Sequence, residues 1–232
     1  MRILSCLLIL CIFLSASCSK PVNPAEKFSN KGRLAYSKKN YKEAFEYYKR
    51  AAELGDTVAM VKLAGLHYDG EGTLKDYKEA FKWSRKAAEL RNPAAMFYMG
   101  LFYYYGWEPI IRDYGEAIKW WKKAAELGDA GAMMYLGNIY DGSYDYKDNV
   151  GIYRDDRGTV DNTDNHKAFK WYKKAAELGN TKAMYHLGRM YYFGHGVLWK
   201  DPKKAKYWIK KAYEAGYEDA EKLWNELELW KY

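Results

Sequence analysis

A short sequence that recurs along the chain constrains the fold more than any other feature. The segment Lys123-Ala-Ala-Glu-Leu-Gly128 has close copies that start at Arg50, Lys86, Lys174 and Lys211. From copy to copy the first alanine advances by 36, 37, 51 and 37 residues. A fixed period of this length indicates a repeat array, in which each unit stacks on its neighbours. One unit is therefore about 36 residues long, and an insertion of roughly 14 residues interrupts the fourth.

The second helix of each unit, called helix B, is preceded by a residue that can cap a helix N-terminus. This residue stands four positions before an aligned alanine, and the five examples are Asn40, Asp76, Asp113, Asp164 and Asp201. In three units a glutamate follows three residues later and predicts a capping-box-like pair, at Glu43, Glu79 and Glu116. A glycine ends helix B where a left-handed residue is favoured, at Gly55, Gly128, Gly179 and Gly216.

The first helix, called helix A, has one apolar face at helical spacing. Its copies begin at Ala59, Ala95, Ala132 and Ala183. Five positions later stands a small residue, which is Ala64, Gly100, Gly137 or Gly188. Glycine inside a helix costs about 1 kcal/mol relative to alanine, so its recurrence predicts that a neighbouring helix approaches closely at this point.

These helices, with the pattern Lys/Glu-Ala-x-x-Trp-x-x-Lys-Ala-Ala-Glu-Leu-Gly, resemble the Sel1-like repeat, a relative of the tetratricopeptide repeat. The resemblance covers nearly all of residues 25–216. It implies an all-α fold, an α/α solenoid coiled as a right-handed superhelix, in which the A helices line a concave groove. We predict a solenoid over residues 25–232, with units at 25–55, 56–91, 92–128, 129–179 and 180–216 and a capping helix at 217–232.

The N-terminus has the features of an export signal. A positive charge at Arg2 precedes an apolar run from Ile3 to Leu14, which is shorter than the roughly 20 residues of a spanning helix. Small residues directly before Cys18 resemble a bacterial lipoprotein signal. We therefore predict a signal peptide at residues 1–17, lipidation of Cys18, a tether at 18–24 and a place in the bacterial cell envelope. Plain secretion and an uncleaved anchor are the alternatives.

The cysteines and the basic residues indicate further properties of the mature chain, which is the chain that remains after the predicted cleavage. Cys6 and Cys11 lie in the segment predicted to be removed, so no disulfide is expected within the remainder. The formal net charge of the whole chain is +8. Paired basic residues, such as Lys122 and Lys123, recur at the same two positions of each helix B. They indicate either a solvated convex surface paired with nearby glutamates or a surface for anionic head groups; nucleic acid is not expected, because of the export signal.

No catalytic motif of the common hydrolase, nucleotide-binding or zinc-protease types occurs in the sequence. Two Gly-x-Gly pairs, at Gly70 and at Gly194, recur at the turn between helices A and B and are interpreted as structural. The four histidines occupy different positions of different units, so no metal site is predicted. We expect neither a cofactor nor a catalytic residue.

Residues that face the groove vary between units, and variable groove positions are where a solenoid carries its specificity. Three positions after the first alanine of helix A stand Lys62, Tyr98, Tyr135 and His186; six positions after it, beside Gly65, stand Leu101, Asn138 and Arg189. Tyrosine and arginine are frequent anchors of protein interfaces. We predict that this row binds a protein or an extended or helical peptide.

The insertion, residues 143–162, is acidic in a chain that is basic elsewhere. Long loops in compact folds are often functional. The spacing of its aspartates does not match an EF-hand loop, which argues against calcium. We expect an acidic loop that covers the groove edge or pairs with a basic surface of another molecule.

The sequence favours a non-enzymatic, lipid-anchored adaptor that binds a protein or peptide of the bacterial envelope. An enzymatic alternative comes from the resemblance, because some cysteine-rich exported Sel1-like proteins bind or weakly hydrolyse β-lactams. Their repeats carry paired cysteines, and the mature chain predicted above has none. A self-assembling structural protein is the third possibility.

Overall fold

The computed structural model describes residues 23–142 and 164–227, and these form helices joined by turns, with no strand among them. The A helices are α2 (Pro24–Ser37), α4 (Thr57–Asp69), α6 (Pro93–Tyr105), α8 (Ala130–Asp141), α10 (Thr181–Phe193) and α12 (Glu218–Glu226). The B helices are α3 (Tyr41–Glu53), α5 (Tyr77–Glu89), α7 (Tyr114–Glu126), α9 (Asn165–Glu177) and α11 (Pro202–Glu214). The predicted signal peptide, Cys18 and the insertion 143–162 lie outside the described residues.

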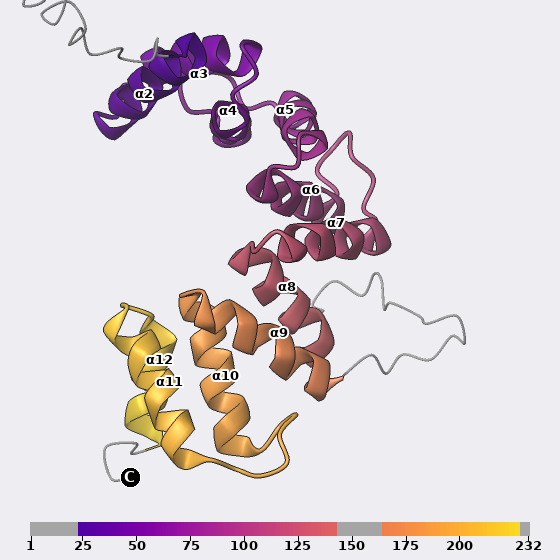
Figure 1. Ribbon diagram of the computed structural model, residues 1–232, viewed down its shortest axis with the longest axis vertical. Coiled ribbons are helices and arrows are strands. Elements are labelled where there is room, and N and C mark those ends of the chain that lie inside the picture. The colour runs from indigo at the N-terminus through magenta and orange to yellow at the C-terminus, as the bar shows by residue number, and fades with distance from the viewer. Residues whose placement is uncertain (1–22, 143–163, 228–232) are drawn as a thin grey trace, which may run out of the picture.

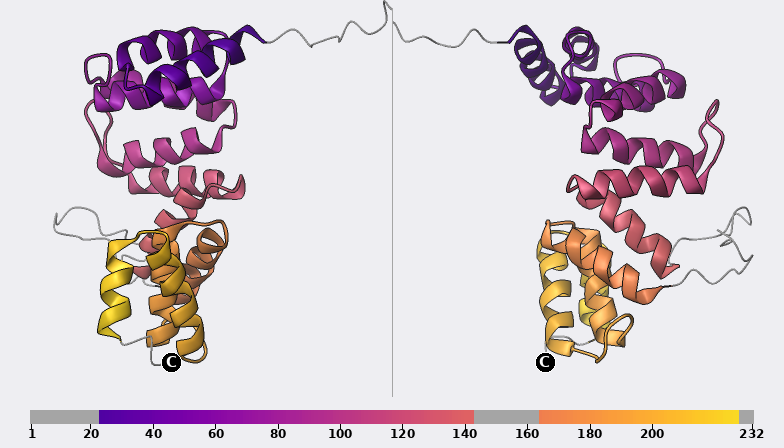
Figure 2. Two further views of the ribbon diagram at one scale, coloured as in Figure 1. Left: turned by 90° about the vertical axis from the view of Figure 1, so that its left-hand side faces the viewer. Right: turned by 45° about the vertical axis from the view of Figure 1, so that its right-hand side comes forward.

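The helices form a single curved stack, in which each helix packs on the helices before and after it (Figure 1). The stack also twists along its length, so that α11 and α12 run across the direction of the N-terminal helices (Figure 2). The predicted all-α solenoid is therefore confirmed. Its interfaces are built on the repeated Ala-Ala pairs of the B helices, which are fully or almost fully buried at Ala51, Ala87, Ala124 and Ala175.

Four of the five units are held together by a glycine of helix A packed under a large residue of helix B. In the third unit a Cβ atom added to Gly100 would overlap the indole of Trp121. That indole is fully buried, and its Nε1 donates a hydrogen bond to the carbonyl oxygen of Phe97 at 3.2 Å. The other pairs of this kind are Gly32 with Tyr48, Gly137 with Tyr172 and Gly188 with Ile209. The predicted close approach of the helices is thus confirmed.

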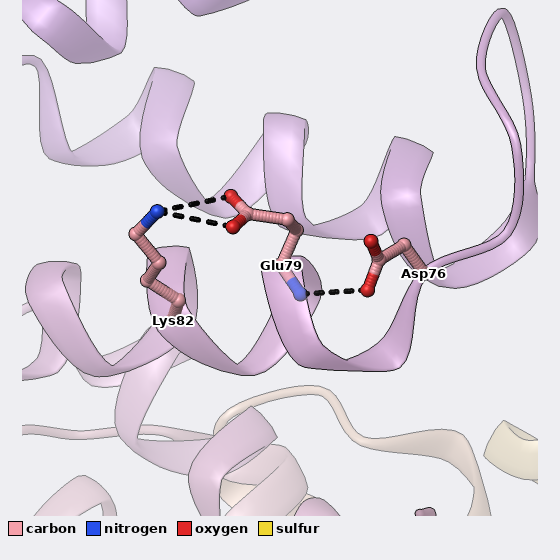
Figure 3. Close-up of polar contacts among 3 residues, drawn as sticks. All are labelled: Asp76, Glu79 and Lys82. Carbon is pink, nitrogen blue, oxygen red and sulfur yellow. Dashed lines mark hydrogen bonds and ion pairs between the residues drawn. The ribbon is translucent and has the colours of Figure 1, made fainter. Parts of the chain in front are cut away.

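The aspartate caps of the B helices form as predicted. In α5 a carboxylate oxygen of Asp76 accepts a hydrogen bond from the backbone N–H of Glu79 at 3.0 Å (Figure 3). Asp113, Asp164 and Asp201 cap α7, α9 and α11 in the same way. A side-chain cap of this kind contributes about 1 kcal/mol to helix stability.

Two details of the predicted caps are wrong. Asn40 makes no cap hydrogen bond, because it follows Lys39, which has left-handed backbone torsions (φ 59°), in a tight turn, and its side-chain amide donates to Glu43 at 2.7 Å instead. The reciprocal half of the capping box is also missing in α5. The Glu79 carboxylate pairs with Lys82 at 3.0 Å (Figure 3), and the backbone N–H of Asp76 donates to the His67 carbonyl.

The two ends of the stack differ from its middle. The first unit joins its helices by a short turn in place of the glycine loop. At the C-terminal end, α12 packs on α11 through Ala220 and Leu223, which are buried, and its acidic first turn is exposed. One apolar face and one charged face suit a terminal helix that covers the last unit.

We predict that Gly100→Ala lowers the free energy of unfolding by about 1–3 kcal/mol, because the new methyl group displaces Trp121 from a filled site. Gly65→Ala is the matched control, since Gly65 lies in the middle of α4 and an added Cβ meets nothing within 4 Å. This control should be neutral or stabilising by about 0.5–1 kcal/mol, because alanine is the better helix former. Urea unfolding measures both, and equal stability of the two variants would contradict the packing described above.

Candidate binding groove

The seven residues predicted to form the groove fall into three separate groups in the structure. Tyr98, Leu101 and Tyr135 line one pocket on the A-helix side. Asn138 and His186 contact Tyr172, a buried side chain of α9. The remaining two, Lys62 and Arg189, are exposed. The seven residues therefore have three different kinds of surroundings.

The pocket lies where α4, α5, α6 and α8 meet, and its volume is about 550 Å³. This volume is in the range of sites that bind small molecules or side chains, about 300–1,000 Å³. Its lining consists of small residues (Ala64, Gly65 and Ser84), aromatic residues (Tyr68, Tyr98, Phe102, Tyr105, Trp107 and Tyr135), Leu101 and Asp69.

The pocket exists because the second unit lacks the large B-helix residue of the other units. In the third unit Trp121 extends from Gly100 to the next A helix, where its ring centroid lies 4.9 Å from that of Tyr135. The position equivalent to Trp121 in the second unit is Ser84, which is buried. A serine leaves empty the space that a ring would fill, so Tyr98, the counterpart of Tyr135, borders a cavity and stays 40% exposed.

Trp107 contributes the largest ring of the pocket lining, and the sequence analysis missed it. It lies in the turn after α6, and its ring stacks on Tyr105 at 4.7 Å between centroids and meets Tyr68 edge to face at 4.8 Å. Tyr77 at the start of α5 also stacks on Trp107, at 5.7 Å. Aromatic neighbours on several sides hold the indole in place. The available signal was that the loop after α6 departs from the Gly-x-Gly pattern: Trp107 follows Gly106, and Glu108 stands in place of the second glycine.

The electrostatics of the pocket are negative. Asp69 is the one charged residue among the described residues that line it. Burial and the charges of Asp69 and Asp129 raise the pKa of Tyr98 above its ordinary value. Burial and neighbouring groups, including Asp69, also raise the pKa of Tyr68. The phenols therefore stay neutral and can donate hydrogen bonds, while the site repels anions.

Comparison with known proteins decides the family. The sequence model of the Sel1 repeat matches five consecutive stretches, residues 29–56, 57–92, 93–129, 130–180 and 181–217. The chain belongs to the Sel1 repeat family. Sel1 repeats generally form protein-binding scaffolds rather than catalytic centres.

Solved structures agree with this assignment. A Sel1 repeat protein from Oxalobacter formigenes is 32% identical, with a TM-score of 0.72 over 91% of this chain and 80% of that one. The protective antigen c5321 of uropathogenic Escherichia coli, which has the same repeat fold, is 29% identical, with a TM-score of 0.66 over 84% of this chain and 39% of that one.

A similarity to a curated protein is more local. Over 81 residues, the chain is 35% identical to the ERAD-associated E3 ubiquitin-protein ligase component HRD3A of Arabidopsis thaliana. The match spans 35% of this chain and 11% of that protein. It therefore concerns a short segment of a much longer chain.

Asn138 and His186 serve the packing of the fourth and fifth Sel1 units. The hydroxyl of Tyr172 donates to the side-chain oxygen of Asn138 at 2.7 Å. The His186 ring lies parallel to that of Tyr172, at 4.8 Å between centroids and an angle of 6°. Burial lowers the pKa of His186 to about 4 from 6.5, so the imidazole is neutral at pH 7. These contacts give both residues a role in packing.

Lys62 and Arg189 are the exposed members of the predicted row. The guanidinium of Arg189 lies 5.7 Å from the ring centroid of Tyr185 on the same helix. Neither residue lines the pocket. They stand on α4 and α10, two A helices separated by two others.

The basic pairs of the B helices are largely engaged within their own helix. In three pairs the first member meets a glutamate four residues later, as Arg85 meets Glu89 at 3.0 Å. The second lies over a tryptophan three residues earlier, and the distances from Nζ to the ring centroid are 5.1 Å for Lys86, 4.4 Å for Lys123, 5.0 Å for Lys174 and 5.4 Å for Lys211. Such contacts favour the interpretation as a solvated surface, since each is weak and open to water.

The loop glycines have packing roles. A Cβ atom added to Gly72 would overlap the backbone of Tyr41, and one added to Gly196 would overlap that of Asn165. Both glycines also have positive φ, 73° and 67°. These contacts support the structural interpretation of the Gly-x-Gly pairs.

Residues 23–142 and 164–227 contain no group of three or more His, Cys, Asp or Glu side chains placed to hold a metal ion. Within the same ranges no helix has the length and hydropathy needed to cross a membrane.

We predict that His186 makes the stability of the protein fall in acid. Its pKa is about 4 in the folded protein and about 6.5 when unfolded, so between these values the unfolded chain binds a proton that the folded chain does not. Stability is therefore lost as the pH falls from 6.5 to 4, by up to about 3 kcal/mol.

His186→Phe keeps a ring over Tyr172 and removes the titration. Urea unfolding at pH 7 and pH 4.5 should show a smaller loss for this variant than for the wild type. His195→Phe, at an exposed loop position, should leave the pH dependence unchanged. An equal loss in all three proteins would contradict the role given to His186.

Proposed function

We propose that this Sel1 repeat protein is a non-enzymatic adaptor that binds a protein partner at the pocket between its second and third units. The observation that carries the proposal is the pocket itself, where Ser84 replaces the large side chain that fills this position in the other units. The pocket combines fixed aromatic rings with one carboxylate and tyrosine hydroxyls. Aromatic anchoring sites with a few polar groups are typical centres of protein recognition.

The exposed apolar surface around the pocket supports binding of a macromolecule. Tyr98 and Tyr105 remain 40% and 41% exposed at its border, so a partner would gain apolar contact beyond the cavity. Tyrosine contributes large contact area at low cost in side-chain entropy. Tyr98, Leu101 and Tyr135 keep the role proposed from the sequence, whereas Asn138 and His186 act through the packing of Tyr172.

A place in the bacterial envelope, with lipid attached to Cys18, is part of the same proposal. It is supported by the apolar leader at Ile3 to Leu14 and by the small residues before Cys18. A tethered adaptor on the membrane surface would search two dimensions for its partner and would hold it near the lipid anchor.

A photo-crosslinker at two positions tests the binding face. Placed at Tyr98 in the native cell, it should give a discrete protein adduct, and placed at Lys122, on the exposed face of α7, it should give little or none. Leu101→Glu should reduce the Tyr98 adduct about tenfold or more, because it puts a second negative charge into the pocket and removes an apolar contact. Equal adducts from both positions, or an adduct insensitive to Leu101→Glu, would refute the proposed face.

A further inference from the structure

The lining of the pocket has a charge pattern opposite to that of the chain. The whole sequence carries a net charge of +8, yet no lysine, arginine or histidine is among the described residues that line this pocket. Aromatic rings and one carboxylate, Asp69, take their place. The faces of aromatic rings attract cations, and tryptophan does so most strongly.

Asp69 is available for a ligand. Within residues 23–142 and 164–227 its carboxylate makes no ion pair and no side-chain hydrogen bond with the chain, and the residue is exposed at the end of α4. Most other carboxylates near helix ends are engaged, as Asp76 is with the start of α5 and Glu89 is with Arg85. A carboxylate left without a partner beside aromatic rings is suited to a charge-assisted hydrogen bond.

The ring cluster is held in place before any ligand binds. Trp107 contacts Tyr68, Tyr77 and Tyr105 at centroid distances between 4.7 and 5.7 Å. Phe102, which is buried, meets the same indole edge to face at 5.5 Å. A ligand therefore does not have to order these side chains, and this preorganisation favours affinity.

We propose that the pocket binds the guanidinium group of an arginine side chain of the partner, with the rings of Trp107 and the tyrosines against the cation and Asp69 accepting its N–H groups. Arginine suits this site better than lysine, because its flat cation stacks on aromatic faces and donates two parallel hydrogen bonds to a carboxylate. The inference rests on the proposed function only in taking the arginine from a protein.

Small probes test the recognition without a known partner. The full-length protein, labelled uniformly with ¹⁵N, is titrated at constant ionic strength with N-acetyl-arginine methylamide, with the neutral isostere N-acetyl-citrulline methylamide and with tetramethylammonium chloride. The Trp107 indole signal is assigned by its loss in Trp107→Leu. We expect it to shift with the arginine compound, which should bind about tenfold or more tightly than the citrulline compound.

Matched variants locate the effect. Asp69→Asn should weaken the arginine compound about tenfold and leave the weak binding of citrulline unchanged. Glu53→Gln removes an exposed carboxylate outside the pocket and should change neither. Trp107→Leu should abolish the shifts of other pocket signals, while Trp199→Leu, at an 82% exposed position of the corresponding loop in the fifth unit, should not.

The other outcomes of the titration either overturn the binding of arginine or leave it in place. Equal binding of arginine and citrulline compounds, or no shift with either, would overturn the inference and leave the crosslinking result for protein binding untouched. Binding of tetramethylammonium with no response to the arginine compound would also overturn it and would assign the pocket to quaternary ammonium groups. A positive arginine titration without an adduct at Tyr98 would keep the cation site and remove the protein partner.

Discussion

The packing of a small residue on helix A against a large residue on helix B determines the rest of this structure. Where Gly100 meets Trp121, the two helices approach closely and the indole reaches the next unit at Tyr135. The same contact determines how the two helices of a unit pack on each other and how that unit packs on the next one. In the second unit Ser84 occupies the position of Trp121. Its small side chain is buried between the helices and leaves a cavity open toward the third unit. We propose that the binding function of this solenoid arises from this local exception to its repeat.

Much of the fold could be predicted from the sequence because it depends on local patterns that recur. The aspartate caps and the small residues of the A helices stand at equivalent positions of successive repeats in the sequence. The structure has them where expected. The cap at Asn40 failed because its geometry depends on the preceding left-handed Lys39, which the aligned position does not reveal. Where the backbone conformation of a unit differs, the same type of residue at the same repeat position makes different contacts.

The candidate site was harder to predict, for a physical reason. The position of Tyr98, Tyr135 and His186 in the repeat is the same, but what each side chain does depends on the residue beneath it in the previous helix B. His186 rests on Tyr172, Tyr135 on Trp121, and Tyr98 has Ser84 in place of a ring. The pocket is a property of pairs of residues about 14 positions apart. Trp107 was missed because it stands in a loop that was read for its glycines alone.

The central claim is that the missing ring at Ser84 creates the binding site, and the double substitution Ala64→Gly with Ser84→Tyr tests it most directly. This variant gives the second unit the Gly–Tyr pair of the first and fourth units, at Gly32 and Tyr48 and at Gly137 and Tyr172. Affinity for the crosslinked partner is measured beside the free energy of unfolding. The account predicts a folded protein of unchanged or higher stability that no longer binds. A stable double variant with wild-type affinity would contradict it.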